Sequence, residues 1–369
     1  MPRAIIDDAD GTLALLRQSA TQFAARHDGP AGLRNKRAQE SDIERQTWAA
    51  MAEAGWTGLL LPESLGGAGL GLGEQAVLSE ALGYALVAEP LALVCVPAAV
   101  LLANAPPSPE RARLATGLAS GDRIVVPAWQ DSTVTIARDA AALVLNGDLQ
   151  FVNGARSATD FLLLVPGVEG AMLLSVPADQ PGLSVRSRPG VDGAVIASLS
   201  FSACRLTTDR VLDRRDSRDT LLRGALLQAR LALAAELAGI ACGALDRTVD
   251  YSKTRVQFGK PIASFQAIQH RLVEMWMDAE LACAALVRAV ERLSAGDSQE
   301  AHLAVLAAKA RAGDAAVSIG RRAVHLHGAM GYTDECAIGL YLKRALNLSA
   351  AFGQPEALRL EFVARERAA

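Results

Sequence analysis

The spacing of apolar and polar residues divides the chain into three stretches of different character. Residues 1–119 and 213–369 carry apolar side chains at helical spacing. Between them, residues 120–212 consist of short apolar or alternating runs separated by Gly, Asp, Asn and Pro, which is typical of strands. We therefore predict a mostly α-helical fold with an inserted β domain: an N-terminal helical domain (1–119), a middle β-sandwich or barrel (120–212) and a C-terminal helical domain (213–369).

Each predicted helix extends as far as its apolar pattern. The predicted helices are Asp10–Arg26, Ile43–Ala54, Gly73–Val87, Asp219–Arg255, Ser264–Ala295, Gln299–His327, Thr333–Phe352 and a last one after Pro355. Short connections in the C-terminal domain predict antiparallel neighbours and a four-helix bundle. Ser264 is expected to cap the helix that it precedes, and the Gly- and Pro-rich stretch Gly55–Gly71 is expected to be a loop.

Composition narrows the class of protein. The chain has 369 residues, 51% of them hydrophobic, and a net charge of -3, which argues against disorder and against binding to nucleic acid or to anionic membranes. Its N-terminus lacks the pattern of a signal peptide. The longest apolar stretch, Leu91–Ala103, is shorter than the roughly 20 residues of a membrane span. These features predict a cytoplasmic protein.

Three kinds of site are not predicted. The five cysteines are far apart without a CxxC pair, which argues against a disulfide framework or structural zinc. His325 and His327 are two residues apart and face different sides of a helix, so no metal site is expected. The glycines between Gly66 and Gly73 do not fit G-x-G-x-x-G and follow no strand, which argues against a Rossmann dinucleotide site.

Two segments could contact a ligand. Arg255 ends a long helix beside the chain-breaking FGKP sequence, where a guanidinium could bind a phosphate through two parallel hydrogen bonds. Gln266 follows in the first turn of the next helix and could donate to a nucleotide. Read from chemistry alone, a solvated arginine and a capping glutamine remain the alternative. Gly328 and Gly331 interrupt another helix and would let the backbone approach a ligand closely.

Three blocks of this sequence resemble the acyl-CoA dehydrogenase family. They are GWTGLLLPESLGGAGLG, RVQFGKPIASFQAIQHRLVEM and HLHGAMGYTDECAIGLYLKRA, in the order and at the spacing of the family. The R-x-x-F-G-x-x-I-x-x-x-Q block is the most specific of the three. The resemblance covers nearly the whole chain and implies a helical domain, a β domain and a C-terminal four-helix bundle, in agreement with the pattern above.

The resemblance implies that FAD lies across a subunit interface. One chain covers the flavin ring with loops of its β domain, and the neighbouring chain contributes to the diphosphate and adenine end. The matching residues for the second role are Arg255, Phe258, Gln266, His325, Gly328 and, more loosely, Ala329. His325 replaces the family's usual Gln and can still donate a hydrogen bond.

The family's reaction is an α,β-desaturation of an acyl-CoA thioester, in which a Glu removes the α-proton while hydride leaves for the flavin. The two family positions for this base correspond to Phe352 and to Ala229, which precedes Arg230, itself a candidate catalytic residue. Neither holds a carboxylate. The loop Pro127–Thr135 also lacks the Glu and Gly typical of the flavin-covering loop, although residues 151–153 weakly resemble the second flavin-covering strand.

Three hypotheses follow from these departures. The first is a subunit of a heteromeric dehydrogenase, similar to small subunits acting on dicarboxylic or sterol acyl-CoA, whose homologous partner supplies the base. The second is a self-sufficient enzyme with a relocated base, Glu236, which could instead pair with an Arg of another helix. Asp334 and Glu335 could also reach the site or cap the next helix. The third is a scaffold without FAD. The family further implies electron-transferring flavoprotein as acceptor and an even-numbered oligomer.

Overall fold

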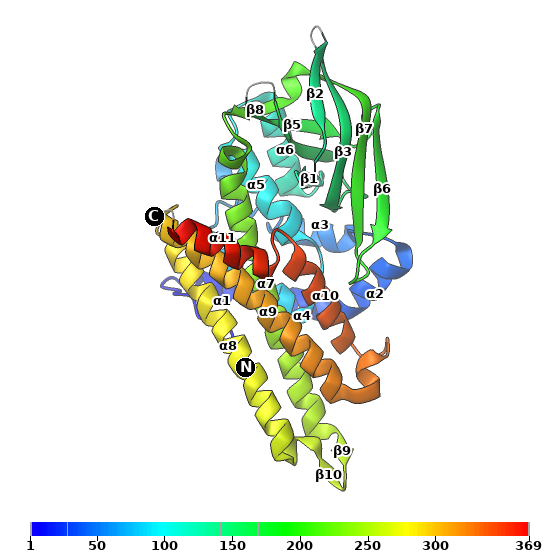
Figure 1. Ribbon diagram of the computed structural model, residues 1–369, viewed down its shortest axis with the longest axis vertical. Helices are drawn as coiled ribbons and strands as arrows, with labels where there is room; N and C mark the ends of the chain where they lie inside the picture. Colours follow the sequence, from blue (N-terminus) through cyan, green and yellow to red (C-terminus); the bar gives the residue numbers. More distant parts are fainter. Residues whose placement is uncertain (1, 28, 131, 140–141, 168–169, 368–369) are drawn as a thin grey trace. The chain divides into compact units, whose positions relative to one another are not determined.

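The computed structural model describes residues 2–27, 29–130, 132–139, 142–167 and 170–367 (Figure 1). The chain divides into two compact units, each built from separate stretches. We call residues 1–33, 72–88 and 230–369 the bundle unit, and residues 34–71 and 89–229 the sheet unit. The helix α7 contributes its first part to the sheet unit and the remainder to the bundle unit.

The helical elements follow one another in chain order. The α-helices are α1 (Thr12–Arg26), α2 (Gly29–Gln39), α3 (Arg45–Glu53), α4 (Leu72–Ala85), α5 (Val96–Asn104), α6 (Pro109–Ser120), α7 (Arg218–Thr254), α8 (Gln266–Ser294), α9 (Gln299–His327), α10 (Ile338–Ala350) and α11 (Pro355–Arg367). Shorter helical turns are η1 (Glu63–Leu65), the π-helical η2 (Leu91–Cys95), η3 (Thr208–Arg210), η4 (Ile262–Ser264) and η5 (Gly328–Tyr332).

The strands form two sheets in the sheet unit and a hairpin in the bundle unit. They are β1 (Val125–Ala128), β2 (Thr135–Asp139), β3 (Ala142–Asn153), β4 (Asp160–Pro166), β5 (Ala171–Pro177), β6 (Leu183–Pro189), β7 (Val195–Thr207), β8 (Val211–Arg215), β9 (Val256–Gln257) and β10 (Lys260–Pro261). The sheet orders are β1-β4-β5-β8 and β2-β3-β7-β6, and β9 pairs with β10. Among the described residues, β1 and β4 pair in parallel and the other strand pairs are antiparallel.

The two sheets differ in how their strands are buried, and the sequence explains the difference. In β3, Leu143, Leu145 and Leu149 are buried while residues between them face outward, as the alternating pattern requires. The run FLLLV of β4 is buried throughout, because this strand lies inside its sheet with apolar neighbours on both faces. The packing of α6 beside α5 and α3 completes this part of the unit.

The bundle unit is centred on α9. Helices α8, α10 and α11 pack against α9, and α1 packs against α4. Helices α4 and α7 approach each other closely: a Cβ at Gly83 would overlap the carbonyl oxygen of Glu236, and a Cβ at Gly239 would overlap that of Glu80. Glycine at these two positions therefore lets two helix backbones touch.

The predicted order of helical, β and helical regions is confirmed, with corrections at several elements. The prediction missed α2, α5 and α6. The helix expected over 333–352 begins only at Ile338 and ends at Ala350, because residues 333–337 form bends and turns. Ser264 does not cap α8. Its hydroxyl donates to the Pro261 carbonyl at 2.7 Å, and Phe265 occupies the N-cap position.

Helix α7 is long and apolar enough to span a membrane by length and composition. In the structure, however, 83% of that apolar window is buried. Burial of this extent is typical of a core helix, whose apolar faces meet its neighbours on all sides.

Candidate functional site

A tight hairpin follows α7 and carries the most specific sequence block. Arg255 ends the helical stretch, and Gln257 pairs with Lys260 across a two-residue loop. The loop residues Phe258 and Gly259 have φ angles of 53° and 78°. Positive φ at both central residues is the geometry of a type I′ turn, which favours Asn-Gly and disfavours a bulky first residue.

Phe258 is therefore held in a conformation that its side chain opposes. The residue is 92% exposed. Its ring meets Phe265 edge-on at a centroid distance of 6.2 Å, and the Lys260 ammonium lies 4.4 Å from the Phe265 centroid. Neither burial nor backbone preference within this chain accounts for a phenylalanine at this position.

The two polar residues of the block are also at the surface. Arg255 and Gln266 are both exposed. Within the described residues, neither side chain has a hydrogen-bonding or ionic partner, and the backbone of Arg255 holds the hairpin by accepting from Ile262 N at 2.8 Å. The guanidinium and amide donors are thus available to a ligand or to another chain.

The structure brings the glycine-interrupted segment to this same end of α7. Helix α9 ends where Gly328 adopts a φ of 61°. The ring of His327 stacks on Tyr251 at 4.2 Å, and the Tyr251 hydroxyl donates to the His327 carbonyl at 3.3 Å. Burial lowers the pKa of His327, although its hydrogen bond to the Ala323 carbonyl acts in the opposite direction. Sequence reasoning missed this pairing of Tyr251 with His327.

The remaining residues predicted for this segment lie on its surface. His325, Gly328 and Ala329 are exposed. Asp334 and Glu335 are exposed as well. The predicted cofactor-binding residues are thus all exposed, on the chain that follows α7 and around the end of α9.

The two expected base positions are apolar and buried. Ala229 is fully buried within α7, and Phe352 is 9% exposed with a φ of 55°. The carbonyl of Phe352 accepts a hydrogen bond from Arg230 Nε at 2.8 Å, and Arg230 Nη2 lies 3.0 Å from Glu361 Oε2. Arg230 therefore fixes the turn at Phe352 and links it to α11.

Glu236 forms a buried ion pair. Its Oε1 lies 2.8 Å from Arg344 Nη2 and 3.2 Å from Arg344 Nε, and both side chains are almost inaccessible to solvent. The structure thus shows the alternative considered for Glu236, an ion pair with an arginine of another helix, because Arg344 belongs to α10.

The segments expected to cover a flavin are occupied by contacts of the sheet unit itself. The buried Trp129 accepts a hydrogen bond at its carbonyl from Arg218. Phe151 lies at a register irregularity of β3, has a φ of 59°, and carries the Arg188 guanidinium 5.3 Å above its ring. Asp131, in the loop Pro127–Thr135, lies outside the described residues.

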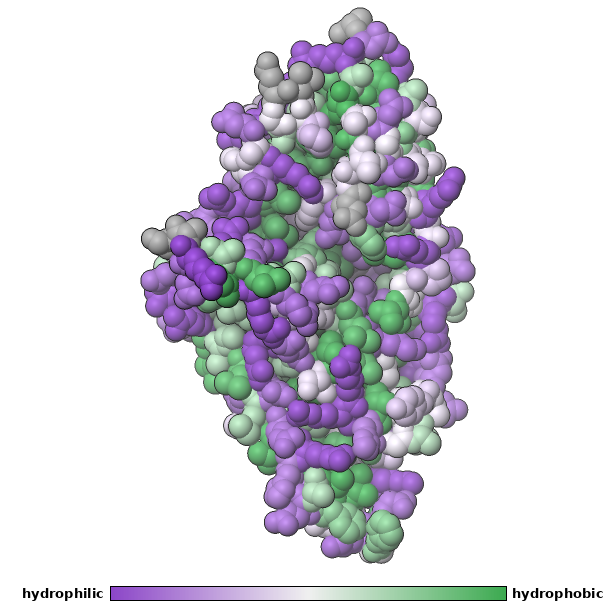
Figure 2. Space-filling view, in the orientation of Figure 1, coloured by the Kyte–Doolittle hydropathy of each residue, from purple (hydrophilic) through white to green (hydrophobic). Residues whose placement is uncertain are grey.

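Helix α8 carries a second apolar stripe that sequence reasoning missed. Its inner face buries residues such as Met275, Ala279 and Leu286. On the other face, large apolar side chains recur at helical spacing and are exposed: Val273, Trp276, Met277 and Leu281. Figure 2 shows apolar residues at the surface over α8 and over the end that carries β9 and β10.

Metal coordination has no support in the described part of the chain, where no group of three or more His, Cys, Asp and Glu side chains is placed to hold an ion.

Comparison with known proteins assigns the class. The sequence profile of the acyl-CoA dehydrogenase N-terminal domain matches residues 12–122, and that of the C-terminal domain matches residues 220–366. The chain therefore belongs to the acyl-CoA dehydrogenase family, whose members are FAD-dependent oxidoreductases.

Individual relatives cover almost the entire chain. The acyl-CoA dehydrogenase IpdE2 of Mycolicibacterium smegmatis is 30% identical over 92% of this chain and 94% of its own length. The solved Tcur3481-Tcur3483 steroid ACAD is 30% identical, with a TM-score of 0.85 over 97% of this chain and 99% of its own. The ChsE4-ChsE5 complex from Mycobacterium tuberculosis is 26% identical, with a TM-score of 0.89 over 98% of both chains.

Proposed function

We propose that this chain is a subunit of a heteromeric acyl-CoA dehydrogenase that completes the FAD site of a homologous partner and lacks a catalytic base of its own. The partner would supply the carboxylate and the flavin-ring contacts. The reaction would be the α,β-desaturation of an acyl-CoA thioester, with FAD accepting the hydride when it is bound.

One observation carries this proposal, the strained and exposed Phe258. A non-glycine residue in the left-handed region costs roughly 1–2 kcal/mol, and exposure of 92% of the residue returns almost none of that through burial. Such strain is typical of positions that are constrained by a function. A phenyl ring held outward beside Arg255 is explained if another chain or its cofactor covers it.

The donor groups around Phe258 suit the diphosphate end of FAD. The Arg255 guanidinium can bind two phosphate oxygens in parallel, and the Gln266 amide can donate to a nucleotide. Gly328 exposes backbone at the neighbouring turn. These residues are exposed in the described chain, as a contribution to a partner's site requires.

The residues at the family's base positions support the need for a partner. A buried alanine and a buried phenylalanine cannot accept the α-proton. Glu236 forms an ion pair with Arg344 of α10, which favours a structural role over that of a relocated base. The self-sufficient enzyme therefore receives no specific support from the geometry.

The outer stripe of α8 supports assembly with another chain. Four large apolar side chains on one exposed helix face form the kind of patch that marks a protein interface. Two relatives above were solved as complexes of two differently named proteins. Because one of them is described as a steroid ACAD, bulky steroid-like acyl-CoA thioesters are the first substrates to test.

The test is the visible absorption spectrum of the chain purified alone and after co-expression with homologous dehydrogenase subunits from the same source. We expect a colourless chain alone and a yellow, active complex that holds one FAD per pair of unlike subunits. A yellow and active chain without a partner would refute the heteromer and favour the self-sufficient enzyme. A complex that stays colourless with every partner would favour the scaffold.

Two variants connect the spectrum to the proposed residues. Phe258→Ala and Arg255→Ala in the complex should lower the FAD content while leaving each subunit folded. Leu360→Ala removes an exposed apolar side chain from α11 and serves as the matched control. If the FAD content of the Phe258 and Arg255 variants equals that of the control, these residues do not complete the cofactor site.

A further inference from the structure

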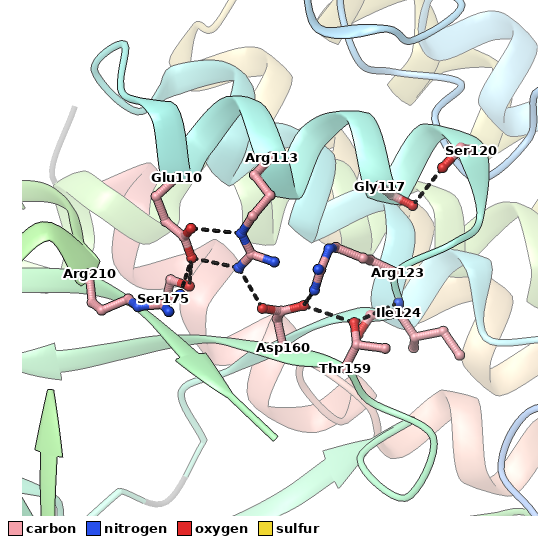
Figure 3. Close-up of polar contacts among 10 residues, drawn as sticks. All are labelled: Glu110, Arg113, Gly117, Ser120, Arg123, Ile124, Thr159, Asp160, Ser175 and Arg210. Carbon is pink, nitrogen blue, oxygen red and sulfur yellow. Dashed lines mark hydrogen bonds and ion pairs between the residues drawn. The ribbon is translucent and has the colours of Figure 1, made fainter. Parts of the chain in front are cut away.

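Three arginines converge on an open cavity in the sheet unit, within residues 89–229. The cavity has a volume of about 610 Å³. Arg113 comes from α6, Arg123 from the segment between α6 and β1, and Arg210 from η3. All three side chains line the cavity, together with Asp160 at the start of β4 and Asp179 after β5 (Figure 3 draws all of these except Asp179).

Two carboxylates hold the arginines in place, and one of them accepts four hydrogen bonds. Glu110 Oε1 accepts from Arg113 Nη2 at 2.7 Å, from Arg210 Nη1 at 2.6 Å and from the Ser175 hydroxyl, while Oε2 accepts from Arg113 Nε at 2.7 Å. A carboxylate offers about four lone-pair sites. Burial opposes ionisation of Glu110, yet the donors of Arg113 and Ser175 and the charge of Arg210 lower its pKa to about 2.

The second carboxylate is nearly filled as well. Asp160 is 1% exposed and accepts from Arg113 at 2.7 Å, from Arg123 at 2.8 Å and from the Thr159 hydroxyl at 2.8 Å. The two acids therefore have little capacity to accept further hydrogen bonds from the guanidiniums.

The guanidiniums, by contrast, have donors to spare. A guanidinium carries five N–H donors, and Arg123 and Arg210 each use one of them in the contacts of the described residues. Three positive groups face two negative ones in this network. Asp179 lines the same cavity, but it is exposed and lies outside ion-pair distance of the arginines.

We propose that this arginine cavity binds a phosphate group, carried either by inorganic phosphate or by a small phosphomonoester. A phosphate presents at least three oxygens, which suits two unused guanidinium edges better than the two oxygens of a carboxylate. The two carboxylates, Asp160 buried and Glu110 partly buried, keep the arginines oriented before the anion arrives. This site is separate from the residues assigned to FAD, which belong to the bundle unit.

The test is isothermal titration calorimetry of the full chain in a low-chloride buffer. The probes are sodium phosphate and glycerol 3-phosphate, with sodium acetate as the carboxylate comparison. We expect saturable binding of phosphate and weaker or undetectable binding of acetate. Tighter binding of glycerol 3-phosphate than of phosphate identifies an ester as the source, and equal binding identifies the free ion. Absence of saturable binding of both phosphates in the millimolar range overturns the proposal.

Variants of the unused donors separate this site from general charge attraction. Arg123→Met and Arg210→Met keep the aliphatic part of each side chain and should weaken phosphate binding about tenfold or more, as the loss of a charge-assisted pair implies. Arg186→Met removes an exposed arginine of β6 and should bind phosphate as the unmodified chain does. Equal affinities for all three variants overturn the proposal.

Folding is checked separately, because the same arginines contact the carboxylates. Thermal unfolding without ligand reports whether each Met variant retains the fold. Arg123→Lys and Arg210→Lys keep the positive charge and remove the planar fork, so they should fold and still bind phosphate more weakly than the unmodified chain. Unchanged binding by both Lys variants would contradict recognition by the guanidinium edges.

Discussion

The ion pair between Glu236 and Arg344 allows a structural role to be separated from a catalytic one. The side chains are 7% and 2% exposed and lie 2.8 Å apart. Removal of one partner takes this attraction away from a charge that stays buried, which costs about 3–5 kcal/mol. Replacement of both by apolar groups of similar volume is close to neutral, because it removes both desolvation penalties together with the attraction.

We therefore expect Glu236→Met and Arg344→Met each to lower the free energy of unfolding by about 3–5 kcal/mol, and the double variant to lose far less than their sum. Urea denaturation of the isolated chain measures all three values. Losses below about 1 kcal/mol for both single variants would refute the argument that the buried pair is needed to offset desolvation, as would a double variant that loses the full sum.

The activity of the assembled enzyme provides the second readout. If Glu236 acts only structurally, the double variant should retain both FAD and dehydrogenase activity in the complex. A stable, flavin-loaded complex of the double variant without activity would instead identify Glu236 as the base.

Three further predictions concern the bundle unit. Phe258→Asn relieves the left-handed strain and should stabilise the hairpin of the chain purified alone by about 0.5–1 kcal/mol relative to Phe258→Ala, as measured by hydrogen exchange. In the complex, Phe258→Asn should lower the FAD content as Phe258→Ala does. Equal protection from exchange in the two variants would contradict the strain argument. Burial, with a contribution from the charge of Arg230, lowers the pKa of Lys309 from 10.5 to about 7. Between these pH values the folded state binds fewer protons than the unfolded state, so the free energy of unfolding should rise with pH from about 7 to 10.5. The Lys309→Met variant should lack this rise. Parallel pH profiles of the two proteins would show that Lys309 is not responsible. Gly239→Ala should destabilise the protein by several kcal/mol, because the added methyl group overpacks the contact with α4. Gly32→Ala in α2, which has open space around it, should be neutral or stabilising by about 0.5–1 kcal/mol in thermal unfolding.

The sequence predicted a helix best where a regular apolar spacing was bounded by residues that start and end helices. Helix α9 was predicted with its observed limits, since Ser298 caps its start and Gly328 ends it. Helix α5 was missed because Pro97 reads as a breaker, although proline is tolerated in the first turn. Helix α2 was missed because Gly29 and Pro30 open a mostly polar segment whose periodicity is weak.

The candidate site was predictable as a set of residues and not as an arrangement. The role of Glu236 depended on what packs opposite, and Arg344 lies 108 residues further along the chain. The outer stripe of α8 could have been read from the spacing of Trp276 and its neighbours. However, a sequence with two apolar stripes on one helix does not reveal which of them faces its own core.

Three phenylalanines of this chain share a strained, left-handed backbone conformation. Phe151, Phe258 and Phe352 all adopt the left-handed conformation, and each stands at a position that the family resemblance relates to flavin or base. At Phe352 the turn is held by Arg230, so its geometry persists although the side chain can no longer take a proton. At Phe258 the strain accompanies full exposure and intact polar neighbours. A chain that does not contact FAD gains nothing from a strained and exposed phenylalanine at position 258, since Asn or Gly would form the same turn at lower energy. A subunit that binds its partner's cofactor without acting on a substrate of its own is expected to keep the turn at Phe258 and to lose the carboxylate at Phe352.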